Sequence, residues 1–326
     1  MEHSFIAWAK QRVSKLNQPE VGIGDDAAVL RPSNRSRVVT TDSLCEGSHF
    51  VLSECGPRAV GRKLAGANLS DLAAMAATPT DMFVSLCLTK LVNKPDIREQ
   101  PVASTIGSGE RGLSPSQIAV EIFEGIVEYA ERYGVAISGG DTNLWDGPLV
   151  VSMTAIGESP EGGCWLRSAA KPGDHVVVTG ELGGSILGRH LNIEPRIELA
   201  KILKKEFKID AATDISDGLG VDLLSLFSAS RCGAEIELNK IPVSDAALKL
   251  SNITGKSAIE HAMGDGEDFE LLLAVPESEM HRLPAELVGV RLTSIGRFVS
   301  RTGLWQRDGG KVKQLAPKGY VHGTSF

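Results

Sequence analysis

Short β-branched runs alternate along this chain with stretches in which apolar residues recur at helical spacing, a pattern typical of α/β or α+β architecture. In the first half the pattern predicts strands at 37–42, 82–90, 135–138 and 149–157, and helices at 58–77 and 115–133. In the second half, glycine-rich or acidic turns separate shorter strands from helices, as in KPGDHVVVTGELGGS and AATDISDGLGVDLLSLF. We therefore expect mixed α/β structure in both halves.

Segment 94–114 contains proline, glycine, serine and charged residues without any period, which predicts a loop or an insertion. Its GSGERG run, residues 107–112, superficially resembles a phosphate-binding loop. No predicted strand leads into that run and no Lys-Ser/Thr pair follows it, so the pattern favours a flexible loop.

A shift in composition at SPEGGCW, residues 159–165, predicts a domain boundary. Because 326 residues are many for a single core, we expect two domains, 1–158 and 159–326. Five scattered cysteines without a CxxC pair predict neither a zinc site nor a disulfide framework. A net charge of -7 and the lack of a membrane-length apolar run disfavour nucleic acid and membranes as partners. We expect a cytoplasmic protein.

The predicted helix at 58–77 contains the stretch GANLSDLAAMAA, in which polar residues interrupt an otherwise buried pattern. One interpretation is that Ser70 or Asp71 caps a helix that begins there. The other is that a carboxylate is kept on a packed helix for a functional reason.

Five short segments place aspartate beside glycine, serine or threonine where an element is predicted to end: 22–30, 40–43, 68–71, 138–142 and 214–218. Each segment alone is an ordinary turn. Together they predict a cleft of carboxylates, which repel one another unless cations neutralise them. Magnesium suits such oxygen ligands and bridges them to phosphates. The pattern indicates phosphoryl transfer, without the P-loop or protein-kinase motifs.

The motifs GIGDDAA, TTDSLCEGSHF, ANLSDLAAMAATP, SGGDT, LRSAAKPGD, DISDGL and GEDFEL, in this order, resemble those of the thiamine-monophosphate kinase family. That family belongs to the superfamily of aminoimidazole ribonucleotide synthetase and selenophosphate synthetase, and the resemblance covers about residues 22–320. It implies a two-domain α/β fold whose N-terminal sheet domain forms a homodimer. It also implies Mg2+-dependent transfer of the ATP γ-phosphate directly onto thiamine monophosphate, giving thiamine diphosphate.

The resemblance also implies a role for individual residues. Magnesium ligands would be Asp26, Thr41, Asp42, Asp71, Asp141, Asp214 and Asp217, with Thr40 contributing its backbone; Asp42, Asp71 and Asp141 would be catalytic. ATP contacts would come from Gly140, Asp141, Arg167, Ser216 and Phe123, and substrate contacts from His49, Glu267 and Tyr320. Without the resemblance, His49, Glu267, Tyr320 and Arg167 could each be an ordinary structural or surface residue.

Three features depart from the family pattern: segment 92–114 is longer, the helical region after 184–191 is shorter, and Phe123 replaces a tyrosine near the nucleotide. Two alternatives remain open. One is a superfamily synthetase with another acceptor, which EGSHF and GEDFEL disfavour. The other is a catalytically silent nucleotide-binding paralogue, which the intact acidic residues disfavour.

Overall fold

The computed structural model describes residues 2–90 and 113–320, so the predicted loop at 94–114 lies almost wholly outside the described residues. The chain divides into two compact units. The first comprises Met1–Asn68 and Pro79–Gly157, and the second comprises Leu69–Thr78 and Glu158–Phe326. The sequence placed one boundary after residue 158; the structure adds a short segment of the first half, 69–78, to the second unit.

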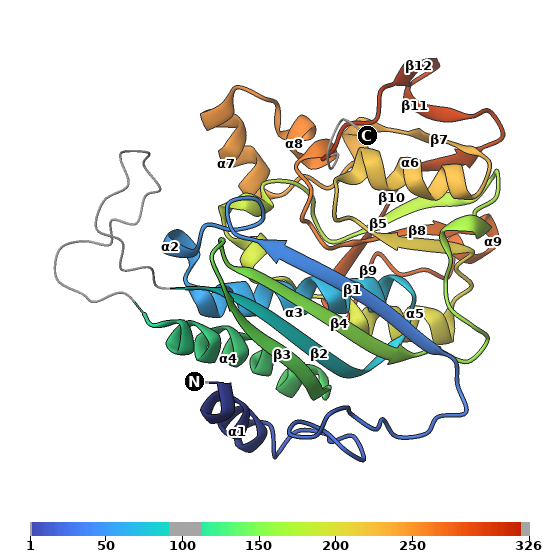
Figure 1. Cartoon of the computed structure of the whole chain (residues 1–326). Helices are drawn as coiled ribbons and strands as arrows, with labels where there is room; N and C mark the ends of the chain where they lie inside the picture. Colours follow the sequence, from blue (N-terminus) through green and yellow to red (C-terminus); the bar gives the residue numbers. More distant parts are fainter. Residues whose placement is uncertain (1, 91–112, 321–326) are drawn as a thin grey trace. The chain divides into compact units, whose positions relative to one another are not determined.

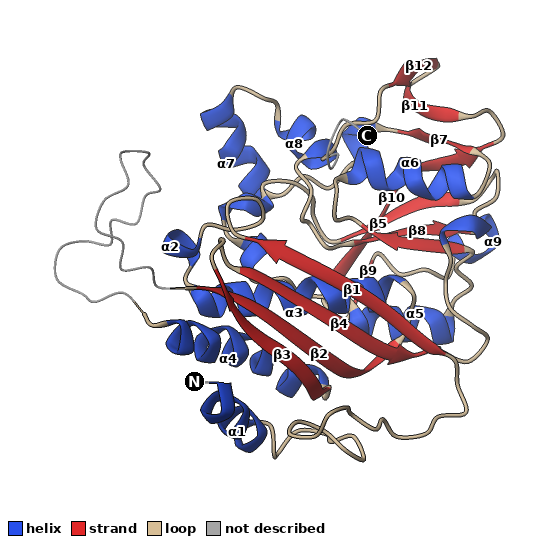
Figure 2. Ribbon diagram, viewed as in Figure 1, coloured by secondary structure: helices blue, strands red, loops and turns tan. Residues whose placement is uncertain are grey.

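The first unit is built on a four-stranded sheet with the strand order β1-β4-β2-β3 (Figures 1 and 2). Its elements are α1 (Glu2–Arg12), β1 (Arg37–Cys45), α2 (Leu52–Cys55), α3 (Pro57–Ala74, which continues into the second unit), β2 (Thr78–Thr89), α4 (Pro115–Tyr133), β3 (Ala136–Trp145) and β4 (Val150–Glu158). Alternate residues of β2 and β4 are buried, so one face of the sheet carries the core.

Two predicted strands are longer in the structure. β1 continues past Asp42 to Cys45, and β3 continues past residue 138 to Trp145. The TTDS and SGGDT motifs therefore lie inside strands, and their interpretation as turns at element ends is wrong. β3 continues because its register with the parallel strand β2 extends to Trp145 opposite Thr89.

Helices α3 and α4 approach each other closely at two glycines. A Cβ atom on Gly61 would lie 2.0 Å from the carbonyl oxygen of Ile122, and one on Gly125 would lie 2.1 Å from that of Arg58. α4 has the predicted bounds, 115–133, because Ser114 forms a capping box at its start and a left-handed Gly134 ends it.

The second unit contains an eight-stranded sheet whose main order is β12-β11-β7-β10-β5-β8-β6, with β9 paired to β10. Its elements are η1 (Arg167–Ala169), β5 (His175–Thr179), η2 (Ser185–Leu187), η3 (Arg189–Leu191), α5 (Ile197–Glu206), β6 (Ala211–Asp214), α6 (Leu219–Ala229), β7 (Gly233–Ile236), η4 (Leu238–Lys240), α7 (Asp245–Thr254), α8 (Ala258–Gly264), β8 (Leu271–Val275), α9 (Glu277–Met280), β9 (Glu286–Leu287), β10 (Val290–Val299), β11 (Gly303–Asp308) and β12 (Lys311–Leu315).

The core of the second unit forms where α6 packs on the sheet. Leu219, Leu223 and Leu226 of α6 are fully buried against apolar residues of the central strands. This packing fixes the turn between β6 and α6, which carries the DISDG motif. The predicted mixed α/β fold is confirmed in both units. None of the helices in the described part of the chain is long and apolar enough to cross a bilayer.

Candidate active site

Ser70 and Asp71 lie within α3, toward its C-terminal end. The helix begins at Pro57, so the interpretation of these residues as N-terminal caps is wrong. Ser70 is 1% exposed, and its hydroxyl donates a hydrogen bond to Oδ2 of Asp214 at 2.7 Å. Ser70 thus connects α3 to the end of β6 inside the second unit.

Asp214 ends β6 and is only 2% exposed. Burial, followed by the nearby charge of Asp71, raises the pKa of Asp214 to about 7, although the Ser70 hydrogen bond and the charge of Arg167 act in the opposite direction. A desolvated carboxylate beside a second carboxylate is a donor set of hard oxygens that favours a cation. Its chemistry fits Mg2+.

The turn that follows Asp214 is organised by a residue that the sequence did not single out. The backbone N–H groups of Asp217 and Gly218 donate to one oxygen of Asp222, at 3.0 and 3.1 Å. Burial, and then the charges of Asp214 and Asp217, raise the pKa of Asp222 to about 8. The sequence feature that could have indicated this role is an acidic residue in the first turn of α6.

Backbone hydrogen bonds connect three predicted site segments. The N–H of Glu267 donates to the carbonyl of Ser216 at 2.7 Å, and the N–H of Tyr320 donates to that of Asp217 at 2.8 Å. Glu267 has a φ of +54°, a conformation that non-glycine residues rarely adopt. The Tyr320 side chain is 55% exposed. Ser216, Asp217, Glu267 and Tyr320 are therefore adjacent in the second unit.

Two buried carboxylates of GEDFEL were also missed. Asp268 accepts hydrogen bonds from the N–H of Gly183 and from Arg189. Glu270 is 1% exposed and accepts from the Thr179 hydroxyl and from Arg196. These contacts fix the loop that carries Glu267. The motif contained the residues, but only their burial shows that they support the loop.

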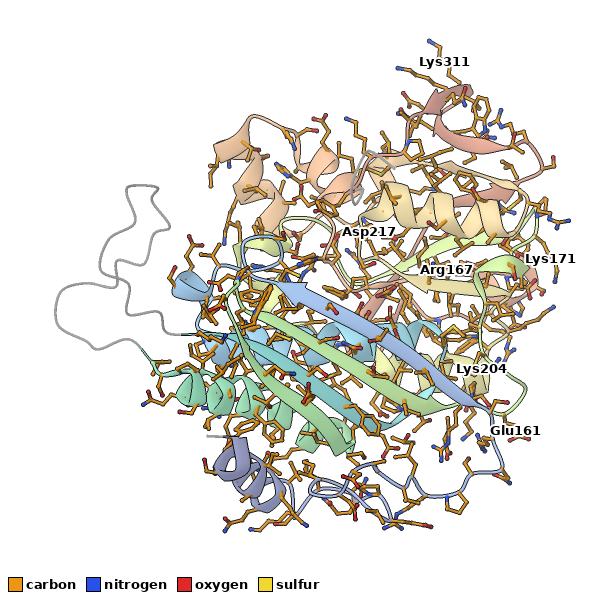
Figure 3. All side chains as sticks on the ribbon, viewed as in Figure 1. Glu161, Arg167, Lys171, Lys204, Asp217 and Lys311 are labelled. Atoms are coloured by element: carbon orange, nitrogen blue, oxygen red, sulfur yellow. The ribbon has the colours of Figure 1, made fainter. Side chains whose placement is uncertain are left out.

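Arg167 lies on the surface of the second unit, in η1 (Figure 3). Its Nε donates to the Thr213 hydroxyl at 3.1 Å, and its carbonyl accepts from the Ser230 hydroxyl at 2.7 Å. The charge of Arg167 also lowers the pKa of Asp214, so the guanidinium lies near the buried carboxylate. This is a suitable place for a group that binds phosphate oxygens.

In the first unit, β1 carries Thr40, Thr41 and Asp42. The Thr41 hydroxyl donates to the carbonyl of Met153 at 3.0 Å and accepts from Thr154. Because side chains alternate along a strand, Asp42 points to the opposite face from Thr41. The two side chains are therefore not gathered around one ion by β1 alone.

Asp141 lies on β3, at the other edge of the sheet from β1. Three strand spacings of about 4.8 Å separate the edges, whereas Mg2+ holds its ligands at about 2.1 Å. The first unit alone thus does not bring Asp42 and Asp141 together. Asp26 is exposed, and its segment runs beside β3, since a Cβ on Gly22 would lie 3.8 Å from the Ser138 carbonyl oxygen.

Two of the predicted ATP contacts, Phe123 of α4 and Gly140 of β3, have clear packing roles. Phe123 is 4% exposed, and its ring packs edge-on against Phe5 and Trp8 of α1. This packing does not support stacking on adenine. A Cβ on Gly140 would lie 2.0 Å from the Val84 carbonyl oxygen, so no larger residue fits between β2 and β3 there.

His49 lies in a tight loop after β1, where its ring Nδ1 accepts a hydrogen bond from the N–H of Cys45 at 3.1 Å. Across the described residues, no group of three or more His, Cys, Asp or Glu side chains is arranged to hold a metal ion as it stands. Magnesium sites commonly combine one or two carboxylates with substrate phosphate oxygens.

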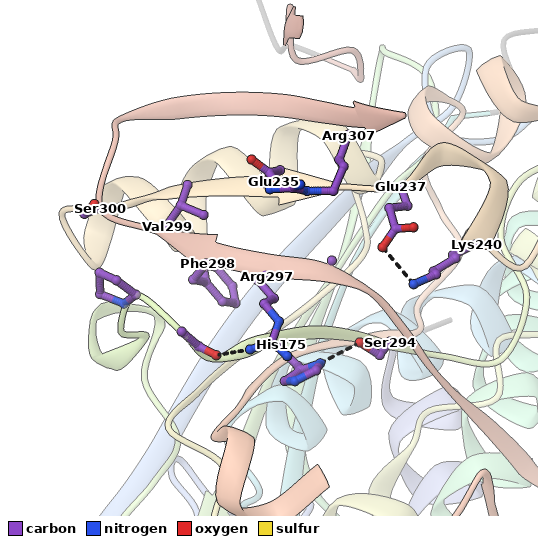
Figure 4. A pocket seen from close by; sticks show the side chains of 13 residues that line it. His175, Glu235, Glu237, Lys240, Ser294, Arg297, Phe298, Val299, Ser300 and Arg307 are labelled. Atoms are coloured by element: carbon purple, nitrogen blue, oxygen red, sulfur yellow. Dashed lines mark hydrogen bonds and ion pairs between the residues drawn. The ribbon is translucent and has the colours of Figure 1, made fainter. Parts of the chain in front are cut away.

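The second unit also has a groove of about 650 Å³, lined by residues of β5, β7 and β10 among others (Figure 4). None of the predicted site residues lines it. Most of its charged groups are paired: Lys240 with Glu237, and Arg307 with Glu235. We therefore do not assign the active site to this groove.

Comparison with known proteins identifies the class of protein to which this chain belongs. Residues 24–159 match the N-terminal domain of AIR synthase related proteins, and residues 171–304 match the C-terminal domain. The chain is 42% identical to a thiamine-monophosphate kinase of Rhodopirellula baltica over 337 residues, which covers 100% of this chain and 98% of the relative.

Solved structures agree. The structure described as AaThiL complexed with AMPPCP and TMP has a TM-score of 0.73 at 28% identity, covering 98% of this chain and 96% of its own. Escherichia coli HypE, a hydrogenase maturation protein, has a TM-score of 0.74 at 18% identity, covering 99% and 98%, which shows the fold alone. The fold is thus that of the AIR synthase related proteins. Within them, the chain belongs to the thiamine-monophosphate kinase family.

The pKa of Asp222 predicts a pH dependence of stability. Because its folded pKa of about 8 lies above its ordinary value, the folded state holds a proton that the unfolded state has lost. In this window the free energy of unfolding falls as pH rises, by up to about 1.4 kcal/mol per pH unit from this group. Asp222→Asn removes the titration, so we expect a flatter dependence between pH 5 and 8.

Urea unfolding in EDTA measures the effect. The exposed Asp245, replaced by Asn, is the matched control. Equal slopes for the wild type and Asp222→Asn would show that this carboxyl does not titrate in the window.

Proposed function

We propose that this chain transfers the γ-phosphate of ATP directly onto the phosphate of thiamine monophosphate, giving thiamine diphosphate and ADP. The observation that carries the proposal is the 42% identity over the whole chain to a thiamine-monophosphate kinase. The carboxylate pair of Asp71 and the buried Asp214, toward the ends of α3 and β6, supports it chemically, since charge neutralisation provides most of the catalysis in phosphoryl transfer.

Magnesium is the cation we assign to the acidic residues, where it would neutralise and align the reacting phosphates. From the second unit, Asp71, Asp214 and Asp217 would hold it. From the first unit, the ligands would be Asp26, Thr40, Thr41, Asp42 and Asp141. The support is the hard-oxygen donor set and the raised pKa of Asp214.

Gly140, Asp141, Arg167 and Ser216 would contact ATP in this proposal, whereas Phe123 would only pack α4 against α1. His49, Glu267 and Tyr320 would contact thiamine monophosphate. Glu267 is well suited to this role, because its strained backbone and the buried carboxylates beside it fix its position before substrate arrives.

We also propose that the protein acts as a homodimer through the sheet of the first unit. Val39 and Trp145 are 60% and 42% exposed on the face of this sheet that carries Thr41 and Asp141, and a second copy would cover them. A two-fold arrangement that sets β3 of one copy against β1 of the other would bring Asp141 to Thr41, which one copy keeps at opposite edges.

Mixing two inactive variants tests this arrangement. We expect Thr41→Val and Asp141→Asn to be inactive separately and to regain about a quarter of wild-type activity after subunit exchange, because half of the dimers are mixed and one of their two sites is intact. Mass measurement verifies the mixed dimers. Mixed dimers without activity would contradict a site shared between copies.

The reaction itself is tested with purified protein, ATP, Mg2+ and a panel of phosphorylated acceptors, with products identified by mass. We expect one ADP for each thiamine diphosphate, and free thiamine to be a poor acceptor because it brings no phosphate to the metals. Turnover of another acceptor but not of thiamine monophosphate would favour a synthetase of the same fold. No turnover together with ATP binding would favour a silent paralogue.

Asp71→Asn separates catalysis from folding. Metal neutralisation of phosphate is worth several kcal/mol, so we expect at least about a hundredfold lower kcat. Because the charge of Asp71 opposes that of Asp214, we expect no loss of stability in metal-free protein. Steady-state kinetics and urea unfolding measure both, with the exposed Asp146→Asn as control. Near-normal kcat at low magnesium would show that Asp71 binds no metal.

A further inference from the structure

A lysine is fully buried in the first unit. Lys63 of α3 is 1% exposed, and its helix neighbours Val60 and Leu64 are 0% exposed. Lysine is almost never buried this completely unless a partner compensates its charge. The group that accepts a hydrogen bond from its ammonium therefore indicates what the residue does.

The ammonium of Lys63 donates a hydrogen bond to the carbonyl oxygen of His49 at 2.7 Å. The charges that act on the Cys55 thiol also place Lys63 near this part of the chain. Burial raises the pKa of Cys55, while the charge of Lys63 lowers it and that of Glu46 raises it. Lys63 thus lies beneath the loop that connects β1 to α2, with Glu46 and His49 on either side of the turn.

Hydrogen bonds within this loop connect its two ends. The N–H groups of Ser48 and His49 donate to the carbonyl of Cys45, and the N–H of Gly47 donates to that of Phe50. The N–H of Cys45 donates in return to Nδ1 of the His49 ring at 3.1 Å. In the neutral ring this places the proton on Nε2, the tautomer that can donate to an oxygen.

His49 is therefore held by its ring and its N–H, which both bond to Cys45, and by its peptide carbonyl, which accepts from Lys63. We propose that Lys63 is a positioning residue, which fixes the His49 peptide so that the imidazole presents Nε2–H to the phosphorylated acceptor. The proposal rests on the proposed function, in which His49 contacts that substrate. Without the ammonium, the His49 carbonyl loses this donor, and the peptide that carries the ring is held less firmly.

A double-mutant cycle tests the connection. Lys63→Met keeps the length and removes the donor. We expect it to raise the KM for thiamine monophosphate about tenfold and to leave the KM for ATP within about twofold, because a binding contact rather than a transition-state contact is lost. In a His49→Ala background, we expect Lys63→Met to have no further effect, since coupled residues are not additive.

The half-exposed Lys201→Met, on α5, is the matched control and should leave both KM values unchanged. Thermal melting verifies folding. If Lys63→Met does not fold, Lys63→Gln, which keeps an uncharged donor, replaces it in the same cycle, with a smaller rise in KM expected. Multiplicative effects in the double variant, or an equal rise in both KM values, would overturn the proposal.

A spectroscopic measurement keeps this test separate from the identity of the substrate. Side-chain ¹⁵N NMR reports the tautomer of His49, assigned with His49→Gln. We expect Lys63→Met to weaken the Nε2–H tautomer signature, even if thiamine monophosphate proves not to be the acceptor. An unchanged His49 signal would show that Lys63 does not position the ring, whereas failure of the acceptor assay alone would contradict only the proposed function.

Discussion

The site depends on how the negative charges at the ends of α3 and β6 are compensated. The carboxylate of Asp214 is almost completely shielded from solvent, and Asp71 adds a second negative charge beside it. Asp71 also lies toward the C-terminal end of α3, where the helix dipole is itself negative. All three effects favour a proton or a cation over a bare carboxylate pair. Ser70 and Arg167 offset only part of this cost, so the second unit is built to accept positive charge.

The groups around this pair are held by backbone and buried side chains, so their positions do not depend on a bound ligand. Glu267 and Phe269 both have positive φ values, at a cost of about 1–3 kcal/mol each. The buried ion pairs of Asp268 and Glu270 hold the strained loop in place. A loop held in this way loses little conformational entropy when it binds, because it is already ordered.

The sequence predicted the features that depend on local chemistry. Helix α4 was found to the residue because Ser114 and Gly134 mark its ends. The SGGDT motif was misinterpreted as a turn, because aspartate and glycine favour turns locally, whereas β3 is extended by its pairing with β2. Lys63 and Asp222 were missed for a related reason. Their importance lies in burial and in contacts that form only when distant segments pack together.

The geometry of the first unit imposes a requirement on any complete site. Its sheet separates Asp42 from Asp141 by three strand spacings, and strand alternation turns Asp42 and Thr41 to opposite faces. Rotamer changes cannot close such a gap, because a carboxylate reaches only a few ångströms from its backbone. Oxygens from outside this sheet must therefore complete the coordination of an ion bound at either edge. The acidic motifs of this sheet are consequently better understood as two partial sites at its edges than as one preformed cluster.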